Sequence, residues 1–227
     1  MILEANSQKS LWDRALVNLS ERDCEPEPEL TEFLRLGSAQ IGCRGLDIGC
    51  GLGRHTLAAL RMGYKITALD FSETAVRRTR RRVSVEGFEV DVRCASMDNL
   101  PFNEAEFDFA FSWCVLNHGT REVFTQAISE ALRILRPSGL LFGYVMSDND
   151  SRLGTGMRVG ERCFVFTEGP ERGICHYFPK KAEIVHLLEL GSRIERFEEV
   201  FFSGVENLFY HPEIEHSSHF EFVAQKY

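Results

Sequence analysis

The chain has 227 residues, of which 44% are hydrophobic and 26% charged, and this composition is typical of a globular protein with a single packed domain. Its formal net charge of −8 disfavours a broad surface for nucleic-acid phosphates, so we expect no DNA partner. No apolar run approaches the ~18 residues that a membrane helix needs, so we expect no membrane partner either.

The cysteines and the first residues bear on the compartment. The seven cysteines are odd in number and no two have C-x-x-C spacing, so we expect reduced thiols and neither a disulfide framework nor a bound metal. The N-terminus carries Glu4 early and lacks the cationic-then-apolar pattern of an export signal. These features favour a cytoplasmic protein.

The predicted elements begin with a helix over residues 6–20 and a shorter helix that ends near Gly37. From residue 44 short apolar strands alternate with helices. The predicted strands are 44–49, 65–70, 88–95, 107–113 and 139–146, and the predicted helices are 54–63, 72–83 and 120–136. This alternation predicts an α/β fold in which helices cover both faces of a parallel sheet, with the ligand outside the carboxyl ends of the strands.

The pattern changes after Met146. Residues 147–161 are typical of a loop, and residues 162–166 and 173–178 are predicted to form two short extra strands. Pro179 is expected at the first position of a helix that ends near Leu190. The last two strands are predicted at 194–202 and 219–226, the final one antiparallel.

A glycine-rich stretch, "LDIGCGLGRHT", spans residues 46–56. Gly49, Gly51 and Gly53 are followed by Arg54, which stands where the dinucleotide-binding fingerprint has its third glycine. An NAD-dependent oxidoreductase is therefore disfavoured, although it remains an alternative. Two further acidic residues, Asp70 and Asp98, come at the end of the second predicted strand and just after the third.

Five segments in order, "LDIGCGLGRHT", "ALDFSE", "CASMDNLPF", "FDFAFSWCVLNHG" and "LRPSGLLFG", resemble the successive motifs of class I S-adenosylmethionine-dependent methyltransferases. The resemblance implies a Rossmann-like seven-stranded mostly parallel sheet with helices on both faces and an antiparallel C-terminal strand. It implies one domain, 1–227, with a helical lid in residues 1–40, a cofactor-binding core in 44–146, and acceptor-pocket elements with closing strands in 147–227. The implied cofactor is S-adenosyl-L-methionine.

The resemblance also assigns roles within the cofactor site. Asp47 should lie near the ammonium group of the cofactor, directly or through water, and Asp70 should accept hydrogen bonds from both ribose hydroxyls. Asp98 should accept from the adenine amine, unless it serves only an Asx turn. Trp113 and Trp12 have core packing as an equal alternative. The implied cofactor-binding residues are Trp12, Asp47, Gly49, Cys50, Gly51, Asp70, Phe71, Ser96, Met97, Asp98, Ser112 and Trp113.

The acceptor is less constrained by the sequence. His118, after the fourth strand, and His176, in the irregular region, are the two catalytic candidates; His211, His216, His219 and Glu168 are further candidate bases. The three C-terminal histidines lack the spacing of a metal site. "NHGT" stands where amino-methylases of DNA carry an N-P-P-Y-like motif, so DNA is disfavoured as the acceptor. The region after residue 146 that would bind the acceptor is short, which favours a small molecule.

We therefore expect a methyltransferase that acts on a small molecule at O, N or C, as a monomer or homodimer. The alternatives are a protein or RNA methyltransferase and a non-catalytic S-adenosylmethionine-binding module.

Overall fold

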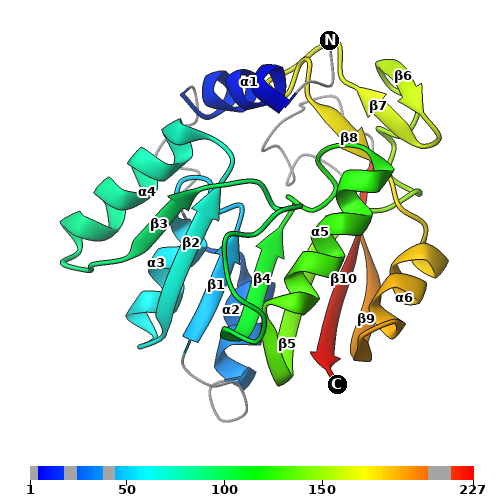
Figure 1. Ribbon diagram of the computed structural model, residues 1–227. Coiled ribbons are helices and arrows are strands. Elements are labelled where there is room, and N and C mark those ends of the chain that lie inside the picture. Colours follow the sequence, from blue (N-terminus) through cyan, green and yellow to red (C-terminus); the bar gives the residue numbers. More distant parts are fainter. Residues whose placement is uncertain (1–4, 18–24, 38–43, 204–215) are drawn as a thin grey trace.

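The computed structural model describes residues 5–17, 25–37, 44–203 and 216–227 (Figure 1). Its centre is a seven-stranded sheet with the order β3-β2-β1-β4-β5-β10-β9. The strands are β1 (Arg44–Ile48), β2 (Lys65–Asp70), β3 (Asp91–Cys94), β4 (Phe107–Trp113), β5 (Leu135–Met146), β9 (Ser192–Ser203) and β10 (His216–Lys226).

The direction of the strands confirms the predicted sheet. Strands β1 to β5 pair in parallel, and β10 runs antiparallel between β5 and β9. The chain moves outward from β1 to β3 and then returns to place β4 on the other side of β1. The carboxyl ends of β1 and β4 therefore form a topological switch point, where open α/β sheets bind ligands.

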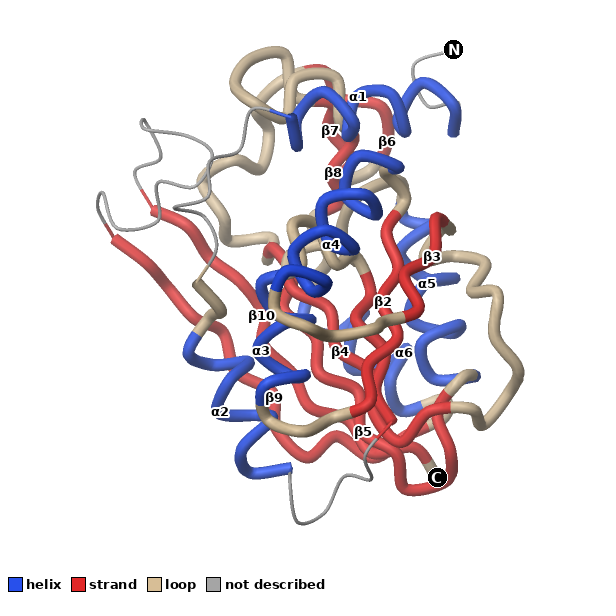
Figure 2. Tube along the Cα trace, turned by 90° about the vertical axis from the view of Figure 1, so that its left-hand side faces the viewer, coloured by secondary structure: helices blue, strands red, loops and turns tan. Residues whose placement is uncertain are grey.

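Helices cover both faces of the sheet (Figure 2). One face carries α2 (Pro28–Gly37), α3 (Arg54–Arg61) and α4 (Glu73–Val85), and the other carries α5 (Arg121–Arg133) and α6 (Lys181–Glu189). Each face has its own apolar cluster: Phe33 and Leu60 belong to one, and Phe124 and Ile184 to the other. Burial of both faces explains why the central strands are apolar throughout.

A helix and a small second sheet lie above the carboxyl ends of the central strands (Figure 1). The helix is α1 (Ala5–Val17), and the sheet has the order β6-β7-β8, formed by β6 (Met157–Gly160), β7 (Cys163–Val165) and β8 (Cys175–Tyr177). The Gln8 side chain ties the two together, since it donates to the Gly173 carbonyl over 3.0 Å and accepts from the Cys175 amide over 3.3 Å.

Several strand bounds differ from the sequence-based expectation by a few residues, and three further differences have a clear structural reason. Strand β6 was expected as loop; it forms because it pairs with β7. Pro179 precedes the helix, which begins at Lys181 after Lys180 as N-cap. Helix α5 ends at Arg133, because Leu135 already pairs with Phe107 of β4.

The described cysteines are free thiols, and Cys24 and Cys43 lie outside the described residues. Among the helices of the described ranges, none has the length and apolarity needed to cross a membrane.

Candidate functional site

A pocket of about 550 Å³ opens at the carboxyl ends of β1, β2 and β4. Helix α1, the loops after β3 and β4, and the ends of β5 and β10 complete its walls. This volume lies within the range of small-molecule sites in proteins. Among the residues predicted to bind the cofactor, the pocket is lined by Trp12, Gly49, Cys50, Gly51, Asp70, Phe71, Ser96, Met97, Asp98 and Trp113.

The glycine loop brings backbone close to this pocket. Gly49 and Gly51 have φ of 80° and 53°, a region that favours glycine. A Cβ on Gly49 would lie 2.4 Å from a methyl group of Val115, so this position needs glycine for packing as well as for its backbone. A Cβ on Gly51 would meet no atom within 4 Å, so the space beside Gly51 is open to a ligand.

Asp70 lies at the end of β2 with its carboxylate held by backbone. The Gly51 amide donates to Oδ2 over 2.9 Å and the Ser72 amide donates to Oδ1 over 2.8 Å. Burial raises the pKa of Asp70 to about 6. Each carboxylate oxygen can accept more than one hydrogen bond, so the oriented carboxylate retains capacity for the two hydroxyls of a ribose.

The loop after β3 forms the next part of the wall. Ser96 and Asp98 are joined by a hydrogen bond between the serine hydroxyl and Oδ1 of the carboxylate. Asp98 and Met97 both line the pocket. A carboxylate beside an apolar thioether suits a flat base that carries an amino group.

Asp47 and Ser112 lie behind the wall and do not line the pocket. Asp47 is 3% exposed and accepts a hydrogen bond of 2.5 Å from the Thr56 hydroxyl. Ser112 is fully buried and donates to the Ile48 carbonyl over 3.1 Å. Both side chains brace the β1 and β4 ends in this structure, so their predicted cofactor contacts stay predictions.

Asp47→Asn should raise the free energy of unfolding at pH 8 by about 1–3 kcal/mol. Burial, with the Asp70 charge adding to it, raises the pKa of Asp47 to about 7. The folded state therefore holds a proton that the unfolded state releases at lower pH, and the wild-type chain loses stability as the pH rises from about 4 to 7. Asparagine carries no charge there, yet can still accept from Thr56.

Urea unfolding at pH 5 and pH 8 measures this difference, with Asp91→Asn at an exposed position as the matched control. A wild-type chain that is the more stable of the two at pH 8 would contradict the assignment.

An aromatic stack forms part of the pocket wall. The Trp113 ring is parallel to the Tyr144 ring at 3.9 Å between centroids, and Tyr144 packs on His219 at 4.7 Å. All three residues line the pocket. Trp113 thus packs against neighbouring aromatic rings and also lines the pocket, and its predicted contact with the cofactor stays a prediction.

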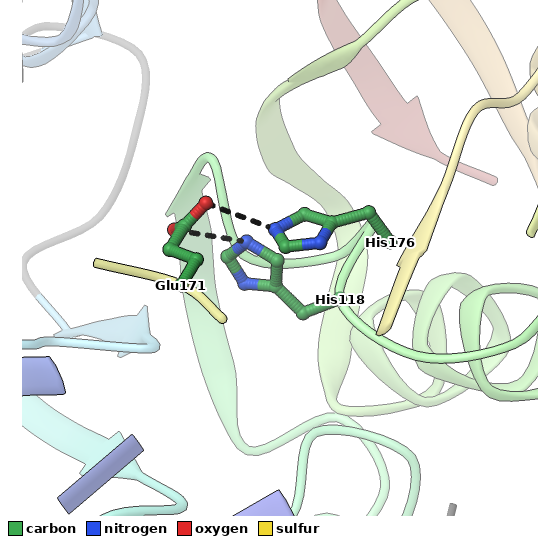
Figure 3. Close-up of side chains that lie close together, drawn as sticks. All are labelled: His118, Glu171 and His176. Carbon is green, nitrogen blue, oxygen red and sulfur yellow. Dashed lines mark ion pairs between the residues drawn. The ribbon is translucent and has the colours of Figure 1, made fainter. Parts of the chain in front are cut away.

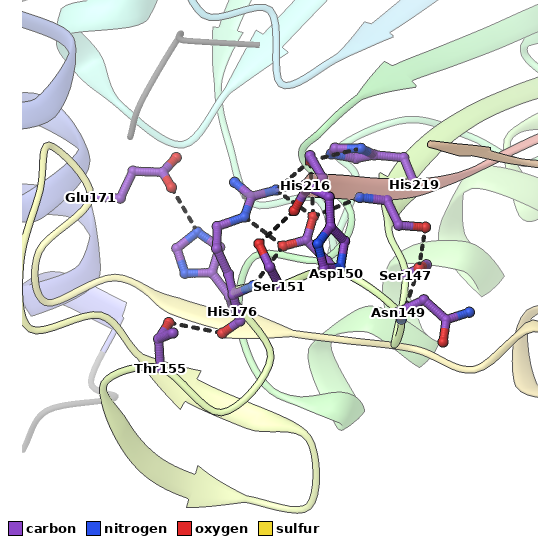
Figure 4. A network of polar contacts seen from close by, with 12 residues as sticks. Ser147, Asn149, Asp150, Ser151, Thr155, Glu171, His176, His216 and His219 are labelled. Carbon is purple, nitrogen blue, oxygen red and sulfur yellow. Dashed lines mark hydrogen bonds and ion pairs between the residues drawn. The ribbon is translucent and has the colours of Figure 1, made fainter. Parts of the chain in front are cut away.

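A buried polar network joins the loop after β5 to β10 beside the pocket (Figure 4). Nε and Nη2 of Arg152 each donate to a carboxylate oxygen of Asp150 over 2.8 Å, and the Ser217 hydroxyl and Ser218 amide bond to the same carboxylate. Burial opposes ionisation of Asp150, but the contacts with Arg152 outweigh it and lower its pKa to about 2. This network fixes the loop after β5 to the start of β10 and presents Arg152 to the pocket.

Helix α1 contributes Gln8, Trp12 and Leu16 to the wall of the pocket. Trp12 lines the pocket and contacts the His118 ring at 4.6 Å between centroids. Asp13 fixes the helix to the start of α4, because Oδ1 accepts from the Ser72 hydroxyl over 2.5 Å and from the Thr74 amide over 2.9 Å. Helix α1 is therefore docked beside the pocket, and its role as a lid stays a prediction.

The two catalytic candidates lie side by side, with Glu171 facing both (Figure 3). His118 Nε2 is 4.0 Å from Oε1 of Glu171, and His176 Nε2 is 3.1 Å from Oε2. Burial, with His176 adding to it, lowers the pKa of His118 to about 3, so its ring is neutral at ordinary pH. His118 lines the pocket.

His176 has a different position from the one expected of a catalytic base. Its side chain is fully buried, stacks on Phe166 at 4.1 Å and does not line the pocket. Burial opposes ionisation of Glu171, but His176, His118 and Arg152 outweigh it and lower the pKa of Glu171 to about 2. His176 can therefore act on a ligand only through its neighbours.

The remaining candidate bases do not gather in one place. His219 lines the pocket, His216 and Glu168 are exposed, and His211 lies outside the described residues. Sequence reasoning missed Glu171 and Arg152, which lie in turns with no motif. It also missed Tyr144, because an aromatic residue within a predicted strand gives no sign of a functional role. No local signal marks any of these three.

The comparisons agree with this geometry. Residues 46–139 match the family model described as a methyltransferase domain. An uncharacterized methyltransferase of Bacillus subtilis is 30% identical over 98 residues, which are 43% of this chain and 41% of that protein. A ubiquinone biosynthesis O-methyltransferase of Xanthomonas axonopodis is 30% identical over 51% of this chain and 48% of its own length. The matched part of the chain thus spans less than half of the length of each of these relatives.

Solved structures show the same fold over most of the chain. An S-adenosylmethionine-dependent methyltransferase from Methanosarcina mazei has a TM-score of 0.71 at 23% identity, covering 89% of this chain and 98% of its own. A Burkholderia thailandensis 1,6-didemethyltoxoflavin N1-methyltransferase, solved with that substrate and S-adenosylhomocysteine, has a TM-score of 0.64 at 19% identity, covering 94% and 79%.

Strand order, switch-point pocket and glycine loop define a Rossmann-like cofactor-binding domain. The match of residues 46–139 to the methyltransferase domain and the shared fold of the structural neighbours support a domain of the class I S-adenosylmethionine-dependent methyltransferase type, with S-adenosyl-L-methionine as its cofactor.

Proposed function

We propose that this chain transfers the methyl group of S-adenosylmethionine to a small molecule. The observation that supports this most is the continuity of the pocket, which runs from Asp70 and Asp98 past Trp113 to His118 and Arg152. A single space of about 550 Å³ beneath a docked helix favours a small acceptor over a folded macromolecule.

The residues present fit the cofactor. The Asp70 carboxylate is oriented by two amides and Gly51 leaves open space beside it. When bound, S-adenosylmethionine supplies a methyl group activated by a positively charged sulfur. We infer that Asp70 orients the ribose, that Asp98, Phe71 and Met97 hold the adenine, and that Trp113 faces the sulfonium region.

The chain's own contribution to transfer is to orient the acceptor and exclude water. Trp12 and helix α1 cover the pocket, and the Trp113–Tyr144–His219 stack offers a flat apolar wall for a ring. We propose that His118 is the catalytic residue that acts on the acceptor, and that His176 and Glu171 are positioning residues for it. The protein is proposed to act in the cytoplasm, as a monomer or homodimer.

Methyl-labelled S-adenosylmethionine tests the proposal. The protein is incubated with a panel of small hydroxylated and amino aromatic compounds, with total RNA, and with protein extract. We expect label in one small-molecule fraction above the rate without enzyme. Label that enters only RNA or protein would contradict the proposed acceptor class, and no transfer to any fraction would favour a binding module.

A further inference from the structure

The cluster of His118, Glu171 and His176 has the composition of a metal site. One ligand atom from each side chain lies within 4.8 Å of the other two. Two imidazole nitrogens and one carboxylate oxygen form a ligand set that zinc and similar divalent cations accept. The sequence predicted no metal, because residues 118, 171 and 176 show no ligand spacing and come together only through the pairing of β8 with the segment after β4.

The Nε2 atom of His176 has no hydrogen-bond partner among the described residues. Nδ1 lies 3.2 Å from the Ile174 carbonyl, which can only accept, so this contact is a hydrogen bond when Nδ1 carries a proton. Metal-binding histidines commonly fix their tautomer through such a contact with a backbone carbonyl. In the neutral ring, Nε2 then presents a lone pair toward the Glu171 carboxylate.

Nε2 of His176 and Oε2 of Glu171 thus face each other at 3.1 Å, although both are acceptors in that state. Both atoms are completely buried, and neither makes a hydrogen bond of adequate geometry with any described residue. His176 is 0% exposed and Glu171 is 4% exposed. Two buried acceptors at this distance require a cation between them, either a proton or a metal ion.

The third side chain favours the metal ion. A proton can join one pair of atoms, whereas His118 Nε2 also faces the same carboxylate, at 4.0 Å from Oε1. Bonds of ~2.0–2.1 Å in a tetrahedral zinc site place ligand atoms about 3.3 Å apart. The separations of 3.1 and 4.0 Å lie on either side of this value, so small side-chain movements would complete the site.

The cluster has one side open to the pocket. His118 and Glu171 line the acceptor half, whereas His176 lies behind them. Three protein ligands and one open position are the arrangement of catalytic zinc sites. We propose that His118, Glu171 and His176 bind one divalent cation of the zinc type, and that its open position receives the hydroxyl oxygen of the methyl acceptor.

The second part of this inference rests on the proposed function and deepens it. A divalent cation with two neutral imidazoles and one carboxylate would leave a net positive charge, which favours a phenol or enol bound as its oxyanion, with its proton released to solvent. The oxygen would then form a bond to the methyl carbon as the methyl–sulfur bond of the sulfonium breaks and its electron pair stays on sulfur. His118 would then be a cation ligand that acts on the acceptor only through the cation, which replaces the direct role proposed above.

Metal binding is measured on the full-length, tag-free chain after treatment with a chelator, by calorimetric titration with zinc chloride and by the visible absorption of cobalt(II). The variants are Glu171→Gln and His118→Gln, with His186→Gln on the exposed face of α6 as the matched control. We expect one cation per chain for the wild type and the control, and at least about 100-fold weaker binding for the two cluster variants.

S-adenosylhomocysteine binding is measured for each variant to show that it is folded, so that either cluster variant alone can carry the comparison. A wild-type chain that takes up no cation, or uptake that both cluster variants leave unchanged, would overturn the inference. Methyl transfer at an unchanged rate after removal of the cation would overturn the part of the inference that concerns the acceptor oxygen and would leave the proposed function in place. Cation binding without any methyl transfer would support the metal site and contradict the proposed function.

Discussion

Asp70→Ala is expected to weaken the binding of S-adenosylhomocysteine at least about 100-fold in isothermal titration calorimetry. The Asp70 carboxylate is held toward the pocket by the Gly51 and Ser72 amides. Two hydrogen bonds from ribose hydroxyls to an ionised carboxylate contribute about 1.5–3 kcal/mol each. Since about 1.4 kcal/mol corresponds to a tenfold change in affinity, their joint loss exceeds two orders of magnitude.

Two further variants separate ligand binding from loop structure. Asp70→Asn keeps one acceptor oxygen and should bind with intermediate affinity. Asp91→Ala removes an exposed carboxylate at the start of the neighbouring strand and should bind as the wild type does. Circular dichroism shows whether each variant is folded. An Asp70→Ala protein with unchanged affinity would rule out the ribose assignment.

Trp12→Ala is expected to weaken S-adenosylhomocysteine binding at least about tenfold. Trp12 lines the pocket and packs against His118, and an aromatic side chain of its size buries ~150–250 Å². We expect its loss to open the pocket to water, because Trp12 is one of the few α1 residues that line it. The same titration measures this effect.

Val17→Ala is the matched control on the same helix, where the side chain is 64% exposed. It should leave the affinity unchanged. Asp13→Ala removes the acceptor that fixes α1 to Ser72 and Thr74, and should weaken binding in the same direction as Trp12→Ala. If Trp12→Ala binds as tightly as Val17→Ala, then Trp12 is a core anchor and α1 is no lid.

The sheet could be predicted because its information is local. Strands β2 and β4 have the predicted bounds, since each is a short apolar run buried on both faces. Helix α4 begins after Ser72, whose hydroxyl accepts from the Ala75 amide, as the N-cap pattern predicted. Strand β6 was missed because it is short and largely exposed and forms only through its pairing with β7.

One part of the pocket wall could be predicted for the same reason. Asp70 ends its strand and Gly51 and Asp98 follow theirs, and the carboxyl ends of these strands meet at one edge of the sheet, where all three residues line the pocket. Asp47 and Ser112 are the exceptions, since alternation along their strands turns their side chains behind the wall. Inward or outward orientation at a strand end depends on packing that a motif does not encode.

The acceptor half could not be predicted, because its residues meet through contacts between distant segments. Glu171 reaches His118 and His176 from a turn, and Arg152 meets Ser217 across 65 residues of sequence. His118 and His176 were identified singly, but their proximity depends on the small sheet, which has no repeating pattern. Contacts between residues this far apart leave no periodic pattern in the sequence from which they could be predicted.

The most direct test of the account is a crystal structure with S-adenosylhomocysteine. We predict a ligand beneath α1 with both ribose hydroxyls within hydrogen-bond distance of Asp70, its adenine beside Asp98, and its sulfur facing the space bounded by Trp113 and His118. A ligand bound elsewhere, or an Asp70 carboxylate turned away from the ribose, would contradict the account.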